Sequence, residues 1–237
     1  MLAEYLLFHF GTVEEILPTA AIRPAGMVDA LDFAVRTPAH FAAHRVARGL
    51  DLGCAVGRSA FEMSRTCDEV IGIDFSHAFI EAAEALRGGR CLDYPRLEEA
   101  GITSRLEARI PRGAVPERVR FQQGDAMALP ADLGAFDRVH AANLLCRLSR
   151  PQLLLERLPG LVKSGGELVL ATPCTWLEAY TPPENWPQAG TFDWLKSCLS
   201  GDFELVRQTD EAFLIRETAR KFQWTSSLVT VWRRRTS

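Results

Sequence analysis

The chain of 237 residues is near the upper end of usual single-domain size and is long enough to bury a sizeable core. Its net charge of −3 gives no general attraction to nucleic acid, and no apolar stretch reaches membrane-spanning length. The six cysteines are scattered without C-x-x-C spacing, which argues against a disulfide framework or a structural zinc site. We therefore expect a cytoplasmic protein without nucleic-acid or membrane partners and without a bound metal.

Apolar runs alternate with helical periodicity along the chain, which predicts an α/β fold with a Rossmann-like seven-stranded sheet and helices on both faces. The predicted strands lie near residues 47–53, 69–73, 118–122, 136–142, 166–172, 203–208 and 227–233. The predicted helices span 57–66, 77–86, 150–162 and 190–200, with Ser76 as an N-cap and Pro151 in a first turn. A single domain, 1–237, would include an N-terminal helical segment, 1–44, and an insertion, 88–117. The Gly, Pro, Arg and Glu content of the insertion predicts a surface excursion that is ordered in part or covers the substrate.

The stretch Asp51–Ser59, DLGCAVGRS, is a glycine-rich turn between an apolar run and a helical pattern. Gly53 allows a sharp turn close to a ligand, and Gly57 leaves room between the turn and the helix. Ala55 occupies the second glycine position of the dinucleotide fingerprint, which argues against NAD and favours a cofactor without phosphates. The candidate cofactor residues here are Asp51, Gly53, Cys54, Gly57 and Arg58.

Polar residues also follow the next three predicted strands. Asp74, with Phe75 after it, ends a buried run and is expected to bind ribose hydroxyls. Asp125, followed by Ala126, could be a helix N-cap, or could contact the adenine amino group, as the resemblance to methyltransferases given in the next paragraph implies. Asn143 lies at the carboxyl edge of the sheet, where its amide could contact cofactor and acceptor or could cap a helix.

The pattern Asp-x-Gly-x-x-x-Gly followed by an acid after the next strand resembles motifs I and II of class I methyltransferases, whose cofactor is S-adenosylmethionine. Five stretches together resemble the ovothiol-pathway methyltransferases, which form the C-terminal domain of histidine-cysteine sulfoxide synthases and also occur alone. These stretches are YLLFHFG at 5–11, DLGCAVGRS at 51–59, VIGIDFS at 70–76, TPCTWLE at 172–178 and IRETARKFQ at 215–223.

The resemblance implies methylation of the side-chain-proximal imidazole nitrogen of 5-thiohistidine. Cys174 and Phe10 stand where tyrosines are usual in that family, so 5-selenohistidine is a second candidate acceptor. A separate sulfoxide or selenoxide synthase would then be the functional partner. Two other hypotheses stay open, namely methylation of another small metabolite and a catalytically silent partner of a larger synthase. The oligomeric state is left open.

Methyl transfer to a neutral imidazole depends on alignment and on the correct tautomer more than on a strong base. Asn143, Tyr5 or Glu178 could accept a hydrogen bond from the distal ring N–H, and His9 could contact the ring. An arginine should face the acceptor carboxylate, and Arg216 is favoured over Arg220 and Lys221. Residues 1–11 are interpreted as a lid more than as a sheet-packing helix. The candidate catalytic residues are Asn143, Tyr5 and His9, and the candidate substrate-binding residues are Tyr5, His9, Phe10, Thr175, Trp176, Glu178 and Arg216.

Overall fold

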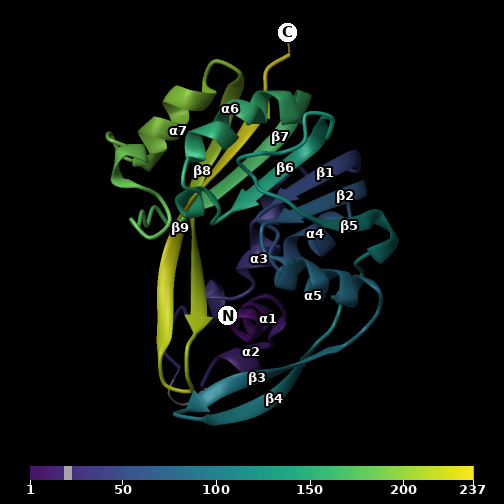
Figure 1. Cartoon of the computed structure of the whole chain (residues 1–237), viewed down its shortest axis with the longest axis vertical. Helices are drawn as coiled ribbons and strands as arrows, with labels where there is room; N and C mark the ends of the chain where they lie inside the picture. The colour runs from purple at the N-terminus through teal and green to yellow at the C-terminus, as the bar shows by residue number, and fades with distance from the viewer. Residues whose placement is uncertain (19–22, 237) are drawn as a thin grey trace.

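A seven-stranded sheet forms the centre of the computed structural model, which describes residues 1–18 and 23–236 (Figure 1). The strand order is β5-β2-β1-β6-β7-β9-β8; the first five strands are parallel, and β9 runs antiparallel to both of its neighbours. This arrangement confirms the predicted seven-stranded α/β sheet. The strands are β1 Val46–Leu52, β2 Cys67–Asp74, β5 Val119–Gln123, β6 Phe136–Ala142, β7 Val162–Thr172, β8 Phe203–Arg216 and β9 Phe222–Arg234.

Two apolar clusters cover the two faces of this sheet. One contains side chains of α4 and α5 together with the N-terminal segment, and the other contains side chains of α6 and α7. The Ser76 hydroxyl accepts a hydrogen bond from Phe79 N at 3.4 Å, and Pro151 begins α6, so both predicted helix starts are confirmed. The four helices are α4 Arg58–Met63, α5 His77–Arg87, α6 Pro151–Leu161 and α7 Thr191–Leu199.

The N-terminal segment is helical, as predicted, but its helices are short. Leu6 and Leu7 of the first helix are buried, so this helix belongs to the core as well as covering the sheet edge. Residues 1–11 were expected to be a lid more than a packing helix, but the buried Leu6 and Leu7 show that this segment also packs in the core. The helices are α1 Leu2–Phe10, α2 Val13–Ile16 and α3 Phe33–Arg36, with 3-10 turns η2 Val28–Ala30 and η3 Pro38–His40; residues 19–22 of the predicted segment lie outside the described residues.

The insertion at 88–117 contains a β-hairpin of its own, β3 Leu92–Glu99 and β4 Ile102–Ala108. Alternate side chains face the core: Tyr94 and Ala108 are buried, and Leu92 and Leu106 pack against the same cluster. This period-two pattern is typical of a strand with one buried face. Pro95 and the many charges between the apolar positions hid that pattern, so the sequence analysis missed both strands.

Strands β8 and β9 are longer than predicted because they continue past the sheet. The pairing of β7 with β9 ends at Thr172 and Leu228, so residues 211–216 and 222–227 project as a two-stranded ribbon beyond the carboxyl end of β7. Figure 1 shows that this ribbon and the β3–β4 hairpin reach the same end of the molecule, with α1 and α2 between them. Ala219 N donates to Glu98 O at 3.0 Å and joins the two tips.

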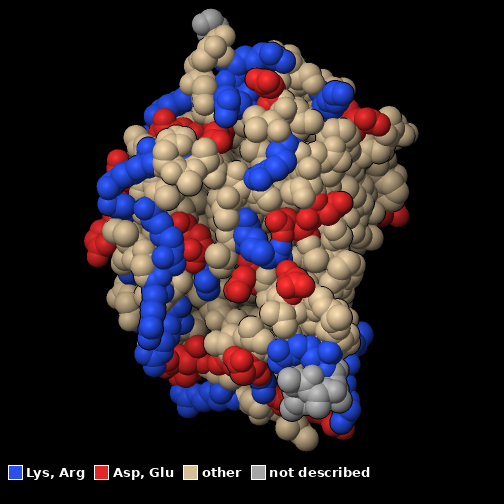
Figure 2. Space-filling view, turned by 180° about the vertical axis from the view of Figure 1, so that it is seen from behind, with Lys and Arg blue, Asp and Glu red and all other residues tan. Residues whose placement is uncertain are grey.

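The surface carries charges of both signs. On the face seen in Figure 2, basic side chains form a band along one side, with acidic side chains among and beside them. Basic side chains are often paired, as Arg48 is with Glu69 at 3.0 Å and Arg65 with Glu62 at 2.6 Å. None of the helices in the described part of the chain is both long and apolar enough to span a bilayer.

Candidate cofactor and acceptor site

The turn after β1 is closely fitted to its surroundings. Gly53 and Gly57 have φ angles of +68° and +90°, and Ala55 has a φ of +47°. A Cβ atom on Gly57 would lie 2.5 Å from Phe121 Cζ, so a larger residue would clash with β5 as well as strain the backbone. The predicted mechanical roles of both glycines therefore agree with the structure. A Cβ atom on Gly53 would likewise lie 3.0 Å from Leu144 Cδ1, so both glycines let the turn pack closely against neighbouring side chains.

Asp74, at the end of β2, holds the same turn. One carboxylate oxygen accepts from Ala55 N and the other from Ser76 N, both at 2.9 Å. Burial raises the pKa of this carboxyl, while the two backbone N–H groups and the charge of Asp51 have smaller effects. Each oxygen keeps a lone pair that could accept from a ribose hydroxyl. Phe75, the next residue, has 72% of its surface exposed at this edge, which suits stacking on a planar ring.

Asp125 lies at the end of β5, the strand beside β2. Its Oδ1 accepts from Met127 N at 2.8 Å and Ala128 N donates to its carbonyl at 2.9 Å, so the side chain does stabilise a local turn. The second oxygen remains free to accept from an adenine amino group. The two interpretations of Asp125 are therefore compatible. Ala126, beside it, is buried and faces the core cluster.

Asp51 is a buried residue of β1. It is 1% exposed, and its Oδ1 pairs with His140 Nδ1 on β6 at 2.7 Å. Its Oδ2 is buried without a partner among the described residues, so the cofactor contact of Asp51 stays a prediction. The sequence analysis missed His140, although its position across from Asp51 in the β1–β6 register brings the two together.

Two other candidates in the glycine turn also pack within the protein. The Cys54 side chain is buried, so only its backbone can face a ligand. Arg58 pairs with Glu62 at 3.0 Å, donates to His9 O at 3.1 Å and lies over the Phe10 ring. Arg58 and Phe10 therefore hold α1 against α4, and their predicted ligand contacts are replaced by these partners.

Asn143 follows β6 and has a φ of +54°. Its N–H donates to Ala171 O at 2.8 Å, and its Oδ1 accepts from the Ser227 hydroxyl at 2.7 Å. Because Oδ1 is held by β9, the free end of the amide is the Nδ2 donor. The helix-capping alternative is not observed. Ser227, which is fully buried, was not recognised in the sequence because its role depends on the β7–β9 pairing.

The α1 helix places Tyr5 beside these strand ends. Its ring packs against Phe79 of α5 with centroids 4.5 Å apart, and 39% of the residue is exposed. Burial raises the Tyr5 pKa, the positive charge of Arg147 acts in the opposite direction, and Asp74 raises it slightly. Tyr5 is therefore within Coulomb range of the Asp74 carboxylate and of the Arg147 guanidinium.

His9, one turn further along α1, is neutral at ordinary pH. Burial lowers its pKa to about 3, and the charge of Arg58 adds to this effect. Its Nδ1 is buried and has no partner among the described residues. A neutral imidazole donates from one nitrogen and accepts at the other, and with this lowered pKa it is a weak base.

Arg147 and Tyr180 are site residues that the sequence analysis missed. Arg147 ends η5, Leu145–Arg147, and its guanidinium lies 4.4 Å from the centroid of the Tyr180 ring. It is exposed and has no ion-pair partner in the described ranges. This cation near Tyr5 therefore remains free to bind an anionic ligand group.

The segment after β7 forms a groove beside β9. Cys174, with a φ of +54°, and Trp176 line a groove of about 450 Å³ together with Leu228 and Asp193. Trp176 Nε1 donates to the Thr191 hydroxyl at 2.9 Å, which anchors the indole to α7. Thr175 and Glu178 are exposed and do not line this groove.

Arg216 is committed to other partners than a ligand. It ends β8, is 7% exposed, and pairs with Glu98 Oε2 at 2.5 Å and with Ile16 O at 3.1 Å. We predicted that Arg216 binds the carboxylate of an acceptor. In the structure it binds the carboxylate of Glu98 on the β3–β4 hairpin instead. The role of Arg216 is to join the ribbon, the hairpin and the N-terminal segment.

The carboxyl ends of β5, β2, β1 and β6 lie side by side, because these strands are neighbours in the sheet. Residues 50–170 match the model of the family described as "Methyltransferase domain". The chain belongs to this methyltransferase family. That membership confirms, at the level of the family, the predicted enzyme class and its cofactor, S-adenosylmethionine.

Comparison with individual proteins agrees with this assignment. The chain is 28% identical over 164 residues to "O-methyltransferase resE" of Aspergillus sclerotiorum, which covers 68% of this chain and 53% of that protein. The chain thus spans about half the length of this curated relative. Its fold is similar to that of YcgJ from Bacillus subtilis, with a TM-score of 0.57, 14% identity and coverage of 86% and 99%. It is also similar to the N-methyltransferase NodS of Bradyrhizobium japonicum in complex with S-adenosyl-L-homocysteine, with a TM-score of 0.51, 14% identity and coverage of 80% and 79%.

Proposed function

We propose that this methyltransferase transfers a methyl group to the side-chain-proximal imidazole nitrogen of 5-thiohistidine or 5-selenohistidine. The observation that carries this proposal is the set of groups at the reacting edge of the sheet: an amide, a phenol and a free guanidinium, contributed by Asn143, Tyr5 and Arg147. They can orient a neutral heterocyclic amino acid. The sequence resemblance to ovothiol-pathway methyltransferases supports the identity of the ring.

The residues present fit the cofactor. Asp74 holds the Gly53–Gly57 turn and keeps acceptors for the ribose hydroxyls, and Asp125 keeps one for the adenine amino group. When bound, S-adenosylmethionine supplies a methyl group on a cationic sulfonium, and the bond broken in the transfer leaves its electron pair on that sulfur. The exposed Phe75 ring would cover the adenine from outside.

The chain's own contribution to the reaction is alignment. An imidazole with a pKa near 6.5 is mostly neutral at pH 7 and already has one nitrogen lone pair, so no strong base is required. Holding two reactants in attack geometry can contribute about 7–11 kcal/mol, which exceeds what one weak base adds. The Tyr5 hydroxyl can accept from the distal ring N–H, and Asn143 Nδ2 can donate to the sulfur or selenium substituent, so the attacking lone pair stays free. The proton on the distal nitrogen leaves to solvent after transfer.

Arg147 takes the place that the sequence analysis gave to Arg216. Its guanidinium is free, lies in the turn directly after Asn143 and is steadied by the Tyr180 ring. A charge-assisted pair with the acceptor carboxylate would anchor the amino acid at the end remote from the reacting nitrogen. The α1 helix would then place Tyr5 and the neutral His9 beside the ring.

Incubation with methyl-labelled S-adenosylmethionine and 5-thiohistidine, 5-selenohistidine or histidine tests the proposal. We expect label in a ring N-methyl group of one or both chalcogen-substituted substrates, located by NMR, and little in histidine. Transfer to none of them, despite saturable cofactor binding, would overturn the assignment. That result would favour another small metabolite or a silent partner of a larger synthase.

Cys174 and Phe10 stand where tyrosines are usual in the ovothiol-pathway family. Cys174 lines the groove beside Trp176, whereas Phe10 packs beneath Arg58. The preference of the enzyme for 5-thiohistidine or 5-selenohistidine should therefore change in Cys174→Tyr and stay the same in Phe10→Tyr. The ratio of kcat/KM for the two acceptors measures this response.

A further inference from the structure

The N-terminal segment is joined to the base of the β8–β9 ribbon by the side chains of Arg36, His40, Arg207 and Glu211, which we call the His40 cluster. The first two belong to α3 and η3, and the other two belong to β8. His40 Nε2 lies 2.8 Å from Glu211 Oε1, and Arg207 Nη2 lies 2.6 Å from His40 Nδ1. Arg36 pairs with Glu211 and donates to Ala212 O. The cluster therefore ties the N-terminal segment to the residues of β8 where the ribbon begins.

The two contacts of the imidazole define its protonation state. A guanidinium has no acceptor, so Arg207 must donate and His40 Nδ1 must accept. His40 is then neutral and donates to Glu211 from Nε2. Burial lowers the pKa of His40, and the charges of Arg207, Arg36 and His140 add to this effect. Protonation of Nδ1 would place an N–H against the guanidinium and break this contact.

The His40 cluster lies next to a hydrogen bond of the site. Glu211 is directly opposite Ser227 in the β8–β9 register. Directly opposite side chains of an antiparallel pair lie on the same face, with Cβ atoms about 4.5–5.5 Å apart. The Ser227 hydroxyl donates to Asn143 Oδ1 at 2.7 Å. One cross-strand pair and one hydrogen bond thus connect Glu211 with the amide that we place against the acceptor ring.

We propose that His40 and Glu211 are positioning residues, which keep Ser227 in the place where it holds the Asn143 amide. The neutral imidazole orients Glu211, and Glu211 fixes the start of the ribbon opposite Ser227. The effect on turnover rests on the role of Asn143 in the proposed function. The hydrogen bond itself can be measured in the protein without an acceptor.

The state of the His40 cluster should depend on pH. Helix α4 also packs against η3, and its charged residues, Arg58 and Glu62, pair with each other at 3.0 Å. The imidazole is neutral at and above pH 6.5, because the pKa of His40 is lowered from that value. The ring contacts should be lost as the pH falls through the lowered pKa, and the bond between Ser227 and Asn143 should weaken with them.

Nuclear magnetic resonance of the whole chain tests this link. The chain contains two asparagines, Asn143 and Asn185, so labelling with [¹⁵N]asparagine gives two resolvable side-chain amides. The Asn143 signals should shift as the pH is lowered from about 8 to about 4.5. The shift should be absent in His40→Gln, because a glutamine amide can accept from Arg207 and donate to Glu211 without gaining a proton.

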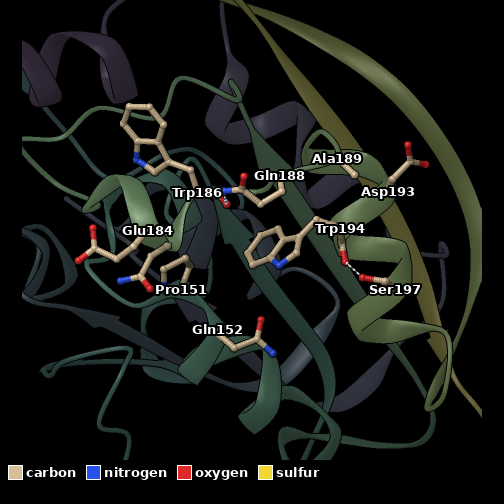
Figure 3. A pocket seen from close by; sticks show the side chains of 10 residues that line it. Pro151, Gln152, Glu184, Trp186, Gln188, Ala189, Asp193, Trp194 and Ser197 are labelled. Atoms are coloured by element: carbon tan, nitrogen blue, oxygen red, sulfur yellow. Dashed lines mark hydrogen bonds between the residues drawn. The ribbon is translucent and has the colours of Figure 1, made fainter.

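Asn185 is the internal control of this titration. It lines a cavity of about 420 Å³ between the start of α6 and α7 (Figure 3). None of the ten lining residues, all of them described, is a histidine. Its Nδ2 donates to Ser149 O at 2.9 Å, so its signals report a bond remote from the His40 cluster. They should not follow the titration of Asn143.

Steady-state kinetics test the same link through turnover. At about pH 7.5, Glu211→Ala should lower kcat about 3- to 10-fold, as the loss of one hydrogen bond does, and leave the KM for S-adenosylmethionine unchanged. Added to Ser227→Ala, it should have no further effect, because Glu211 acts through Ser227. His40→Gln should keep the wild-type kcat, whereas His40→Ala should not. His44→Gln, at an exposed position of the same segment, is the matched control and should keep both the kcat and the Asn143 titration.

Three results would each overturn the proposal. They are Asn143 signals that do not change with pH in the wild type, a shift that persists in His40→Gln, and a further fall in kcat when Glu211→Ala is added to Ser227→Ala. Circular dichroism confirms the fold of each variant at each pH. If Glu211→Ala does not fold, or if no acceptor is methylated and the proposed function fails, the titrations of wild type and His40→Gln decide this inference by themselves.

Discussion

The Ser227 hydroxyl of β9 donates to Asn143 Oδ1 at the end of β6, with the two oxygens 2.7 Å apart. Strand β7 lies between these two strands in the sheet, so the bond reaches across its carboxyl end. It fixes the orientation of the amide that we place against the acceptor ring. The C-terminal ribbon thus takes part in the site formed by the parallel strands.

Ser227→Ala should lower kcat about 3- to 10-fold, which corresponds to the usual net value of one hydrogen bond, because the Asn143 amide is no longer held. The KM for S-adenosylmethionine should change little. Steady-state kinetics measure both constants. Ser226→Ala, at the exposed neighbouring position, is the control. If Ser227→Ala has the wild-type kcat, Asn143 does not need this partner.

Asp74→Asn should weaken binding of S-adenosyl-L-homocysteine by about 1–3 kcal/mol, measured by calorimetry, because an amide presents one acceptor oxygen where the carboxylate presents two. Its NH₂ group would also face a backbone N–H of Ala55 or Ser76. Asp93→Asn, an exposed carboxylate on the β3–β4 hairpin, should have no effect on binding. Unchanged affinity in Asp74→Asn would remove Asp74 from the cofactor site.

The affinity for the same ligand should depend on pH through Asp74. Burial raises the pKa of this carboxyl above 3.8, and the ionised form is the one that accepts from ribose hydroxyls. Affinity should therefore be full above the raised pKa and fall as the pH decreases through it. Asp74→Asn should show a flatter profile between about pH 4 and pH 8, with circular dichroism confirming the fold at each pH. Parallel profiles for both proteins would assign the titration to another group.

Local signals in the sequence were sufficient to predict the turn after β1 and two helix starts. The glycine turn, the acid after β2, the Ser76 cap and Pro151 depend on neighbours close in the chain, and the structure places each as expected. The parallel sheet followed from the alternation of apolar runs with helical periodicity.

Residues whose roles depend on distant partners were missed or misassigned. The pairing of Asp51 with His140, of Asn143 with Ser227 and of Arg216 with Glu98 each joins segments more than 80 residues apart. The sequence shows neither the burial nor the partners of an arginine. It therefore did not distinguish the buried, paired Arg216 from Arg147, which is exposed and has no ion-pair partner in the described ranges. The predicted strand near residues 203–208 also stopped short of the ribbon, although residues 212–215 are apolar and Phe213 and Leu214 are buried in the core.

Glu98→Gln should lower the stability of the protein by about 1–3 kcal/mol, because the nearly buried Arg216 would lose its charged partner. For a chain of this length each kcal/mol corresponds to roughly 2–4 °C in Tm, which calorimetry resolves. Asp93→Asn breaks an exposed pair on the same hairpin and should leave the Tm unchanged. If Arg216→Ala instead raised the acceptor KM without lowering the Tm, the original assignment of Arg216 as the carboxylate partner would be correct.

Arg147→Ala should raise the KM for the amino-acid acceptor and leave the affinity for S-adenosylmethionine unchanged. Loss of a charge-assisted pair corresponds to about 1.5–3 kcal/mol, or roughly 10- to 150-fold in kcat/KM, and Arg147→Lys should recover only part of it because a guanidinium binds both oxygens. The decarboxylated analogue of the substrate provides the matching measurement. Wild type should strongly prefer the acid, whereas Arg147→Ala should use acid and analogue nearly equally. Arg150→Ala, an exposed arginine at the start of α6, is the control and should keep the wild-type preference. If Arg147→Ala also keeps that preference, the carboxylate is bound by another group, and the free guanidinium beside Tyr180 has no role in recognising the acceptor.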